Sequence, residues 1–189
     1  MGFTIDPNAY EDRAPSGDGN NNPRPDVRDG QKVLWLAGIR MGKTRNGDGK
    51  IEACFVVVND PDGGSDERGL VWENFALTQR AAWKLQQISQ ALGQRASWNA
   101  EDQQEALDVL GRRPVLTDVR TEQKRNGEGR VALANRFHPY TGEISQEMED
   151  LANEASDWHS GWVQRRNKNS GYGQNSGYGQ NSKNDDIPF

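Results

Sequence analysis

The sequence has little of what builds disulfide or metal scaffolds. A single cysteine, Cys54, excludes an internal disulfide. One cysteine and two histidines, His138 and His159, cannot form a zinc site without carboxylates. Cys54 also stands in an apolar run, Ala53–Val56, which predicts a buried and unreactive thiol. We therefore expect no metal and no cofactor.

Long apolar runs are also absent. No stretch approaches the roughly 20 apolar residues that cross a bilayer, and the N-terminus lacks the basic start and apolar core of a secretory signal. Hydrophobic residues make up 33% of the chain, so part of it is expected to stay outside any packed core. These features predict a cytoplasmic protein.

Signatures of enzymes are missing as well. Gly42-Lys43-Thr44 resembles the end of a phosphate-binding loop, but position 37 is alanine where that loop needs its upstream glycine. A nuclease needs carboxylates clustered on rigid elements, and the acids here are expected mostly in loops and on helix faces. The sequence around His138 offers no set of residues with which it could form a catalytic site. We therefore expect a binding protein and not an enzyme.

The net charge of -5 is unevenly distributed. Residues 1–30 carry three basic and six acidic residues, and residues 141–189 carry four basic and eight acidic ones. Residues 31–140 carry 16 basic and 14 acidic residues, a net charge of +2. Only the local field near a groove matters for phosphate binding. The middle of the chain is therefore compatible with a nucleic-acid ligand.

Hydrophobic patterning predicts three strands, two helices, two further strands and a final helix. Strands are expected where β-branched and aromatic residues dominate between Gly- and Asn-rich turns, at 32–40, 51–58, 69–75, 114–120 and 130–137. Helices are expected where apolar residues recur at helical spacing, at about 81–92, 99–110 and 145–158. The last helix either packs on the domain or forms an edge or oligomer contact.

This order predicts a mainly β fold. Five strands with a helical insertion between strands 3 and 4 is the layout of the five-stranded OB-fold barrel, although other small barrels share it. We expect four regions: a disordered N-terminal arm (1–30), an OB-fold domain for single-stranded DNA that includes the C-terminal helix (31–166), a disordered low-complexity Gly/Asn/Gln/Tyr linker (167–184) and an acidic tip (185–189).

Proteins that hold single strands combine a positive groove with rings that stack on bases. Two glycine-containing hairpin loops are basic, and in an OB-fold they border one binding face. Trp72 lies beside polar Asn74 and is the preferred stacking ring, whereas Trp35 and Phe55 are expected in the core. The predicted DNA contacts are Arg40, Lys43, Arg45, Lys50, Trp72, Arg120, Lys124, Arg125, Arg130 and Arg136.

The chain ends in a short acidic and apolar segment: Asp185, Asp186, Ile187, Pro188 and Phe189. A terminal phenylalanine offers a ring and an α-carboxylate, which an apolar pocket with a basic rim can bind. Pro188 lowers the entropy lost on docking, and the two aspartates steer the segment towards a basic surface. We therefore expect this tip to bind partner proteins.

The tip closely resembles that of bacterial single-stranded-DNA-binding proteins, which ends in the same Asp-Asp-Ile-Pro-Phe. The resemblance implies that the tip docks on replication and repair proteins and that a Gly/Gln-rich linker separates it from an OB domain. The barrel departs from the usual bacterial sequence, and the stretch 70–85 is more similar to phage-encoded SSB-like OB proteins. That similarity implies a bacterial or phage-infected cell and puts the family's usual tetramer in doubt.

The leading hypothesis is a protein that coats single-stranded DNA, with little sequence preference, during replication, recombination or repair. An adaptor is the alternative, in which the barrel binds a protein and the tip competes for the partners of a cellular single-stranded-DNA-binding protein.

Overall fold

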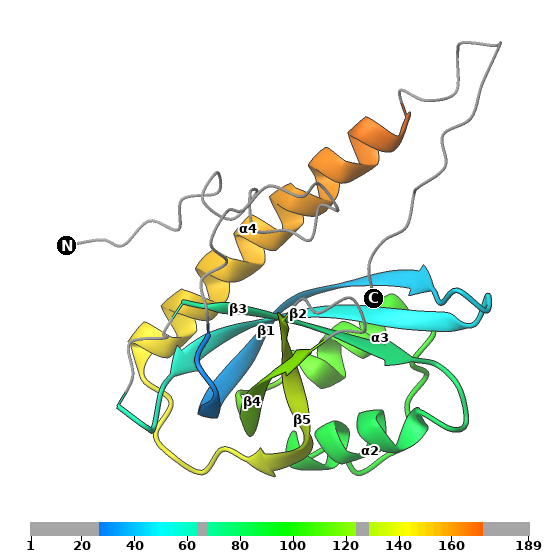
Figure 1. The fold of residues 1–189 in the computed structure, drawn as a ribbon. Helices are drawn as coiled ribbons and strands as arrows, with labels where there is room; N and C mark the ends of the chain where they lie inside the picture. Colours follow the sequence, from blue (N-terminus) through cyan, green and yellow to red (C-terminus); the bar gives the residue numbers. More distant parts are fainter. Residues whose placement is uncertain (1–26, 64–67, 124–128, 172–189) are drawn as a thin grey trace, which may run out of the picture.

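Five antiparallel strands form one sheet in the computed structural model, which describes residues 27–63, 68–123 and 129–171. The strand order is β3-β2-β1-β4-β5, and all neighbours are antiparallel (Figure 1). The strands are β1 (Gly30–Lys43), β2 (Gly49–Asn59), β3 (Leu70–Ala76), β4 (Val115–Gln123) and β5 (Gly129–Pro139). The expectation of five strands, three before the helical insertion and two after it, is confirmed.

The sheet does not close into a barrel, so this part of the expected fold is wrong. Among the described strands, β3 and β5 are the edges, and no backbone ladder joins them. A charged side chain stands between them instead: Glu73 Oε2 accepts from Leu133 N at 3.3 Å. Lys84 Nζ lies 3.1 Å from the same oxygen. An inward-pointing charge is a common way to keep edge strands from pairing.

Three helices complete the described fold: α2 (Ala82–Ala91), α3 (Gln103–Leu110) and α4 (Gln146–Gly171). α3 begins later than the expected residue 99 because Asp102 caps it; Asp102 Oδ1 accepts from Gln104 N at 2.9 Å. α4 continues well past its expected end at Trp158. The fold is therefore mixed, with an antiparallel sheet and three helices.

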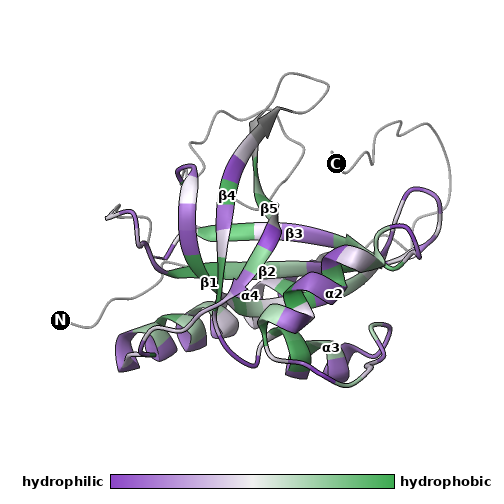
Figure 2. Cartoon of the chain, turned by 90° about the horizontal axis from the view of Figure 1, so that it is seen from below, coloured by the Kyte–Doolittle hydropathy of each residue, from purple (hydrophilic) through white to green (hydrophobic). Residues whose placement is uncertain are grey.

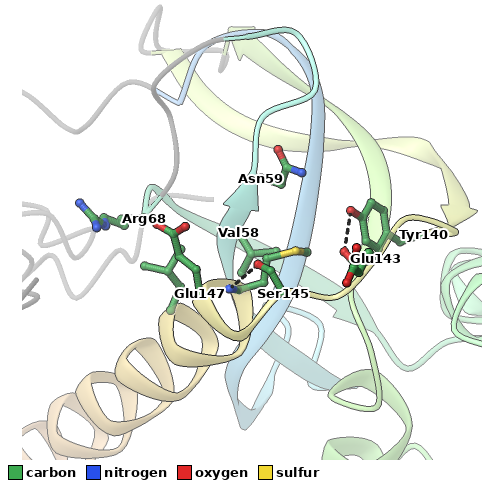
Figure 3. Close-up of a pocket in the computed structure, with 9 residues that line it drawn as sticks. Val58, Asn59, Arg68, Tyr140, Glu143, Ser145 and Glu147 are labelled. Carbon is green, nitrogen blue, oxygen red and sulfur yellow. Dashed lines mark hydrogen bonds between the residues drawn. The ribbon is translucent and has the colours of Figure 1, made fainter. Parts of the chain in front are cut away.

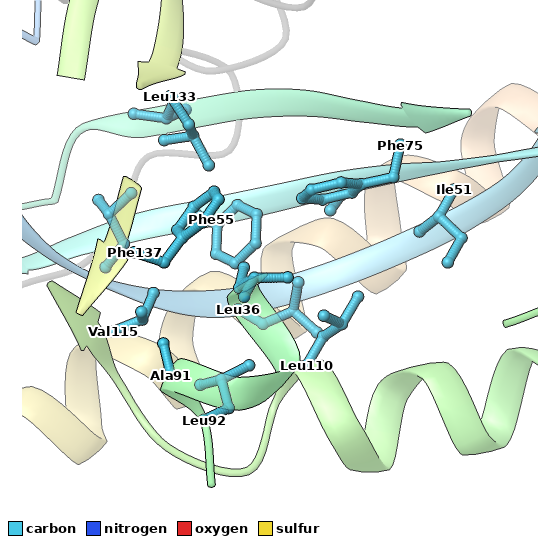
Figure 4. Close-up of a cluster of buried hydrophobic side chains, with 14 of the residues drawn as sticks. Leu36, Ile51, Phe55, Phe75, Ala91, Leu92, Leu110, Val115, Leu133 and Phe137 are labelled. Atoms are coloured by element: carbon cyan, nitrogen blue, oxygen red, sulfur yellow. The ribbon is translucent and has the colours of Figure 1, made fainter. Parts of the chain in front are cut away.

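The inner face of the sheet builds the main core. Phe55, Phe75 and Phe137 meet there, and α2 and α3 cover them from below (Figure 4). Phe55 is buried, as expected for a core ring. Val27 also joins this core, and Asp29 Oδ1 accepts from Thr121 N at 2.7 Å. The packed structure therefore begins a few residues before Gln31.

The outer face of β1, β2 and β3 packs against α4. Figure 1 shows α4 on the side of the sheet away from α2 and α3. The contact is apolar near the start of the helix, and its members are Val33, Ala37, Cys54, Val56, Val58, Met148, Leu151, Ala152, Ala155, Trp158 and Trp162. Burial raises the pKa of the Cys54 thiol, which fits the expected inert cysteine. The C-terminal helix therefore packs on the domain.

An irregularity in β1 changes which side chains share a face. The ladder with β2 shifts register between Leu36 and Gly38, so Ile39 faces the inner core while Ala37 faces α4. Trp35 was expected in the core but is half-buried on the outer face, where its Nε1 donates to Gly111 O at 2.9 Å. Ala37 and Ile39 would share a face in a regular strand, and they do not because the irregularity between Leu36 and Gly38 shifts the strand by one residue.

Candidate nucleic-acid interface

The outer face becomes charged towards the β1–β2 hairpin. Glu52 of β2 lies between two cations: Arg40 Nε donates to Glu52 Oε2 at 2.6 Å, and Lys50 Nζ is 2.6 Å from Glu52 Oε1. Burial raises the pKa of Glu52, but Lys50 and Arg40 together outweigh it, so the pKa is lowered overall. Glu52 and Lys50 are buried and Arg40 is half-buried, so Glu52 is an ionised carboxylate that holds one buried and one half-buried cation on the outer face.

The second half of α4 adds aromatic rings and a third cation to this place. Trp162 lies with its ring centroid 4.9 Å from that of Trp72 on β3. The guanidinium carbon of Arg40 is 5.6 Å from the Trp162 ring centroid, and that of Arg166 is 5.0 Å from it. Both distances are typical of cation–π contacts. One tryptophan thus gathers two arginines from different elements.

His159 completes the group from the buried side of α4. Its ring lies 5.7 Å from Trp72, and Gly38 leaves room for it, because a Cβ there would stand 2.1 Å from His159 Nδ1. Burial, and then the charge of Arg40, lower the pKa of His159 to about 4. His159 is therefore neutral at physiological pH and adds no charge to the group.

These residues form what we call the charged end of the outer face: Arg40, Lys50, Glu52, Trp72, His159, Trp162 and Arg166. It holds three cations and one carboxylate, so it keeps a positive surplus. The pKa of Arg166 is lowered by burial and by the nearby Arg40, in keeping with like charges placed close together. An anion is the ligand that such a surplus favours.

The β1–β2 hairpin extends this positive region. Lys43 and Arg45 are exposed. The turn is fixed by Thr44 N, which donates to Asp48 O at 2.8 Å, and by Gly47, whose φ of +88° suits glycine. The four cations predicted on this hairpin therefore lie on one continuous element, two of them ion-paired with Glu52 and two exposed near the turn.

The cations predicted on the last hairpin are only partly placed. Arg120 and Arg136 are exposed on β4 and β5. Lys124 and Arg125 lie outside the described residues, and the structure describes the backbone but not the side chain of Arg130. The expected convergence of the two basic loops therefore stays a prediction.

Trp72 occupies a different setting from the one expected. It lies on the outer face, as its place beside Asn74 predicted, but α4 covers part of it and leaves it half-buried. Trp162 packs against its ring, so base stacking on Trp72 would involve a ring already in contact with α4. Its role as a DNA contact stays a prediction.

Sequence reasoning missed Trp162 and Arg166 because it ended the helix at Trp158. The signal was present: Trp158, Trp162 and Arg166 follow one another at four-residue spacing, which places them on one helix face. His159 could not have been found this way, because its site depends on Gly38 of a distant strand.

A separate hollow of about 580 Å³ lies where the chain turns from β5 into α4 (Figure 3). Tyr140 OH donates to Glu143 O at 3.2 Å there, and Ser145 Oγ accepts from Met148 N at 3.3 Å. Glu143, Glu147 and Arg68 also line the hollow, with Glu143 near Tyr140 and Arg68 on the opposite side (Figure 3). With two carboxylates and one arginine, these charged side chains are net negative, which disfavours a phosphate chain in the hollow.

The part of the chain that the structure describes holds no group of three or more residues suited to a metal ion. None of its helices combines the length and apolar character needed to span a bilayer. The predicted partner-binding tip, 185–189, lies outside the described residues.

No family model matches the chain, and no curated protein matches it.

Proposed function

We propose that this protein binds single-stranded DNA with little sequence preference and is not an enzyme. The observation that carries the proposal is the positive surplus at the charged end of the outer face, continuous with Lys43 and Arg45 on the β1–β2 hairpin. Cations that follow a phosphate chain, together with aromatic rings, are the means by which proteins hold unpaired strands.

We further propose that the domain is a variant of the OB-fold. Support comes from the strand order, from β1, which pairs with β4 through its first residues and with β2 along most of its length, and from the helices inserted between β3 and β4. The edge strands β3 and β5 approach each other through Glu73 in place of a ladder. This arrangement would leave the β1–β2 hairpin free to border a binding face.

The C-terminal tip is proposed to recruit replication, recombination or repair proteins of the cell. The support is the sequence Asp-Asp-Ile-Pro-Phe at 185–189, with its terminal ring and carboxylate. We propose the cytoplasm of a bacterial or phage-infected cell as the place of action, on the same resemblance.

Binding of the full chain to a labelled dT oligonucleotide of about 30 nucleotides tests the main proposal. Fluorescence anisotropy at low salt should show binding, and a duplex of equal length should compete poorly. A chain lacking 185–189 should keep this affinity or gain some, because an acidic competitor is removed.

The adaptor alternative predicts the reverse pattern for the same two proteins. Neither would bind the oligonucleotide, and the activity would reside in capture of partner proteins by the tip. Absence of binding by the full chain at low salt would therefore exclude the main proposal.

A further inference from the structure

Trp83 differs from the other tryptophans in its exposure. All six tryptophans lie within the described residues, and five are buried or half-buried. Trp83, on α2, is 42% exposed. A single exposed ring is ordinary on a protein surface, so its meaning depends on what surrounds it.

The surroundings of Trp83 contain no acidic residue along the sequence. None occurs between Glu73 and Glu101, although the chain carries 28 acids. Arg80 precedes α2 and Arg95 follows it, and both are exposed. Lys84 is ion-paired with Glu73, 3.1 Å away. α2 therefore carries no acidic residue, although the net charge of the chain is -5.

Exposed polar side chains share the outer side of α2 with this ring. Arg80, Trp83 and Gln87 are three and four residues apart, so they lie on one side of the turn and helix. Gln86 and Gln90 are also exposed, while the opposite side buries Leu85, Ile88 and Ala91. Amides donate and accept hydrogen bonds without adding charge. This side suits a polyanion that also presents flat rings.

The segment that leads into α2 adjoins the base of the β1–β2 hairpin. Leu77 N, just after β3, donates to Gly49 O at the base of the hairpin at 2.7 Å. The chain then turns at Thr78, whose carbonyl accepts from Ala81 N and Ala82 N, and enters α2. Figure 2 shows α2 beside β3. Asp48 is an exposed acid on the hairpin turn, and from Asn74 to the end of α2 the chain carries no acidic residue.

We infer that the outer side of α2 is a second contact surface for single-stranded DNA, with Trp83 as a base-stacking ring and Arg80 as a phosphate contact. This inference rests on the proposed DNA-binding function and adds a surface that lies outside the charged end. It also supplies an accessible ring, which the half-buried Trp72 does not offer without rearrangement of α4.

Intrinsic fluorescence of the full chain, titrated with the dT oligonucleotide, tests the inference. Stacking of a base on Trp83 should quench the wild-type signal, and Trp83→Phe should lose most of that quenching. Trp83→Ala should weaken binding at least about fivefold, as expected for the loss of one stacked base. Arg80→Gln should reduce the dependence of affinity on salt.

Ile144→Ala is the matched control, because Ile144, at 36%, is the other exposed large apolar residue of the described part of the chain and stands among acids. It should leave affinity and quenching unchanged. Undiminished quenching in Trp83→Phe, or wild-type affinity in a folded Trp83→Ala, would overturn the inference while leaving the DNA-binding function intact. No binding by the wild type would instead remove the function itself.

Discussion

The two ends of the outer face of β1, β2 and β3 are built from the same strands and covered by the same helix, yet they differ in chemistry. Near the start of α4, Leu151 and Ala155 are buried in one apolar cluster with Cys54 and Val56. Near its end, Arg166 and Trp162 meet cations and a carboxylate. One end is an apolar contact, and the other gathers the half-buried Arg40 and Arg166 around the buried Trp162. A single long helix thus packs on one sheet through two chemically different contacts.

Truncation at the apolar end should affect stability most. Leu151→Ala removes a buried side chain from the contact between α4 and the sheet and should lower the free energy of unfolding by about 2–5 kcal/mol. Urea denaturation measures this. Ser156→Ala, at an exposed position of the same helix, is the control and should change little. A loss of DNA affinity in folded Leu151→Ala would mean that the two ends are not separate in function.

Acid should weaken the domain through His159. Its pKa is about 4 in the folded protein, below the usual 6.5, so the folded state binds fewer protons than the unfolded chain between these values. The stabilisation is fully present above pH 6.5 and is lost as the pH falls towards 4, by up to about 3 kcal/mol.

The difference in unfolding free energy between wild type and His159→Gln, followed over this pH range, isolates that contribution from the carboxylates. His138→Gln, which alters the exposed histidine, is the matched variant measured beside it. Equal profiles for wild type and His159→Gln would show that His159 is not held neutral beside Arg40.

Removal of the carboxylate at the charged end should strengthen DNA binding. Glu52→Gln leaves Arg40, Lys50 and Arg166 without their acid and should improve affinity for the dT oligonucleotide at low salt by about 1 kcal/mol, roughly fivefold. Glu147→Gln removes an acid about 28 Å from Arg166 along the axis of α4 and is the control. Unchanged or weaker binding by folded Glu52→Gln would place the DNA elsewhere.

The sequence predicted the elements well because their signals are local. Within the described residues, all five strands and three helices were expected near their observed places, and Phe55 was assigned to the core. The misses arise from contacts between distant residues. The shift at Leu36 and Gly38 moves Ile39 to the other face, and the Glu73 side chain holds the sheet edges apart; neither is visible in the periodicity of a strand.

In the candidate site, too, residues with a local sequence signal were predicted and residues that depend on distant contacts were missed. The hairpin cations Lys43 and Arg45 could be read from a glycine-containing basic turn, and their exposure agrees with that interpretation. Trp72 was assigned to the correct face, but its partner on α4 was missed because the helix was ended too early. Trp83 was overlooked because stacking rings were sought only on strands.

The central claim is that cations of the β1–β2 hairpin bind the phosphates of an unpaired strand. The most direct measurement compares the salt dependence of dT binding by wild type, by Lys43→Gln/Arg45→Gln and by Arg112→Gln/Arg113→Gln as the control for charge. The slope of log affinity against log salt should become shallower by about 1.4 in the hairpin variant, for two lost phosphate contacts, and should stay unchanged in the control. Equal slopes in all three proteins would contradict the account.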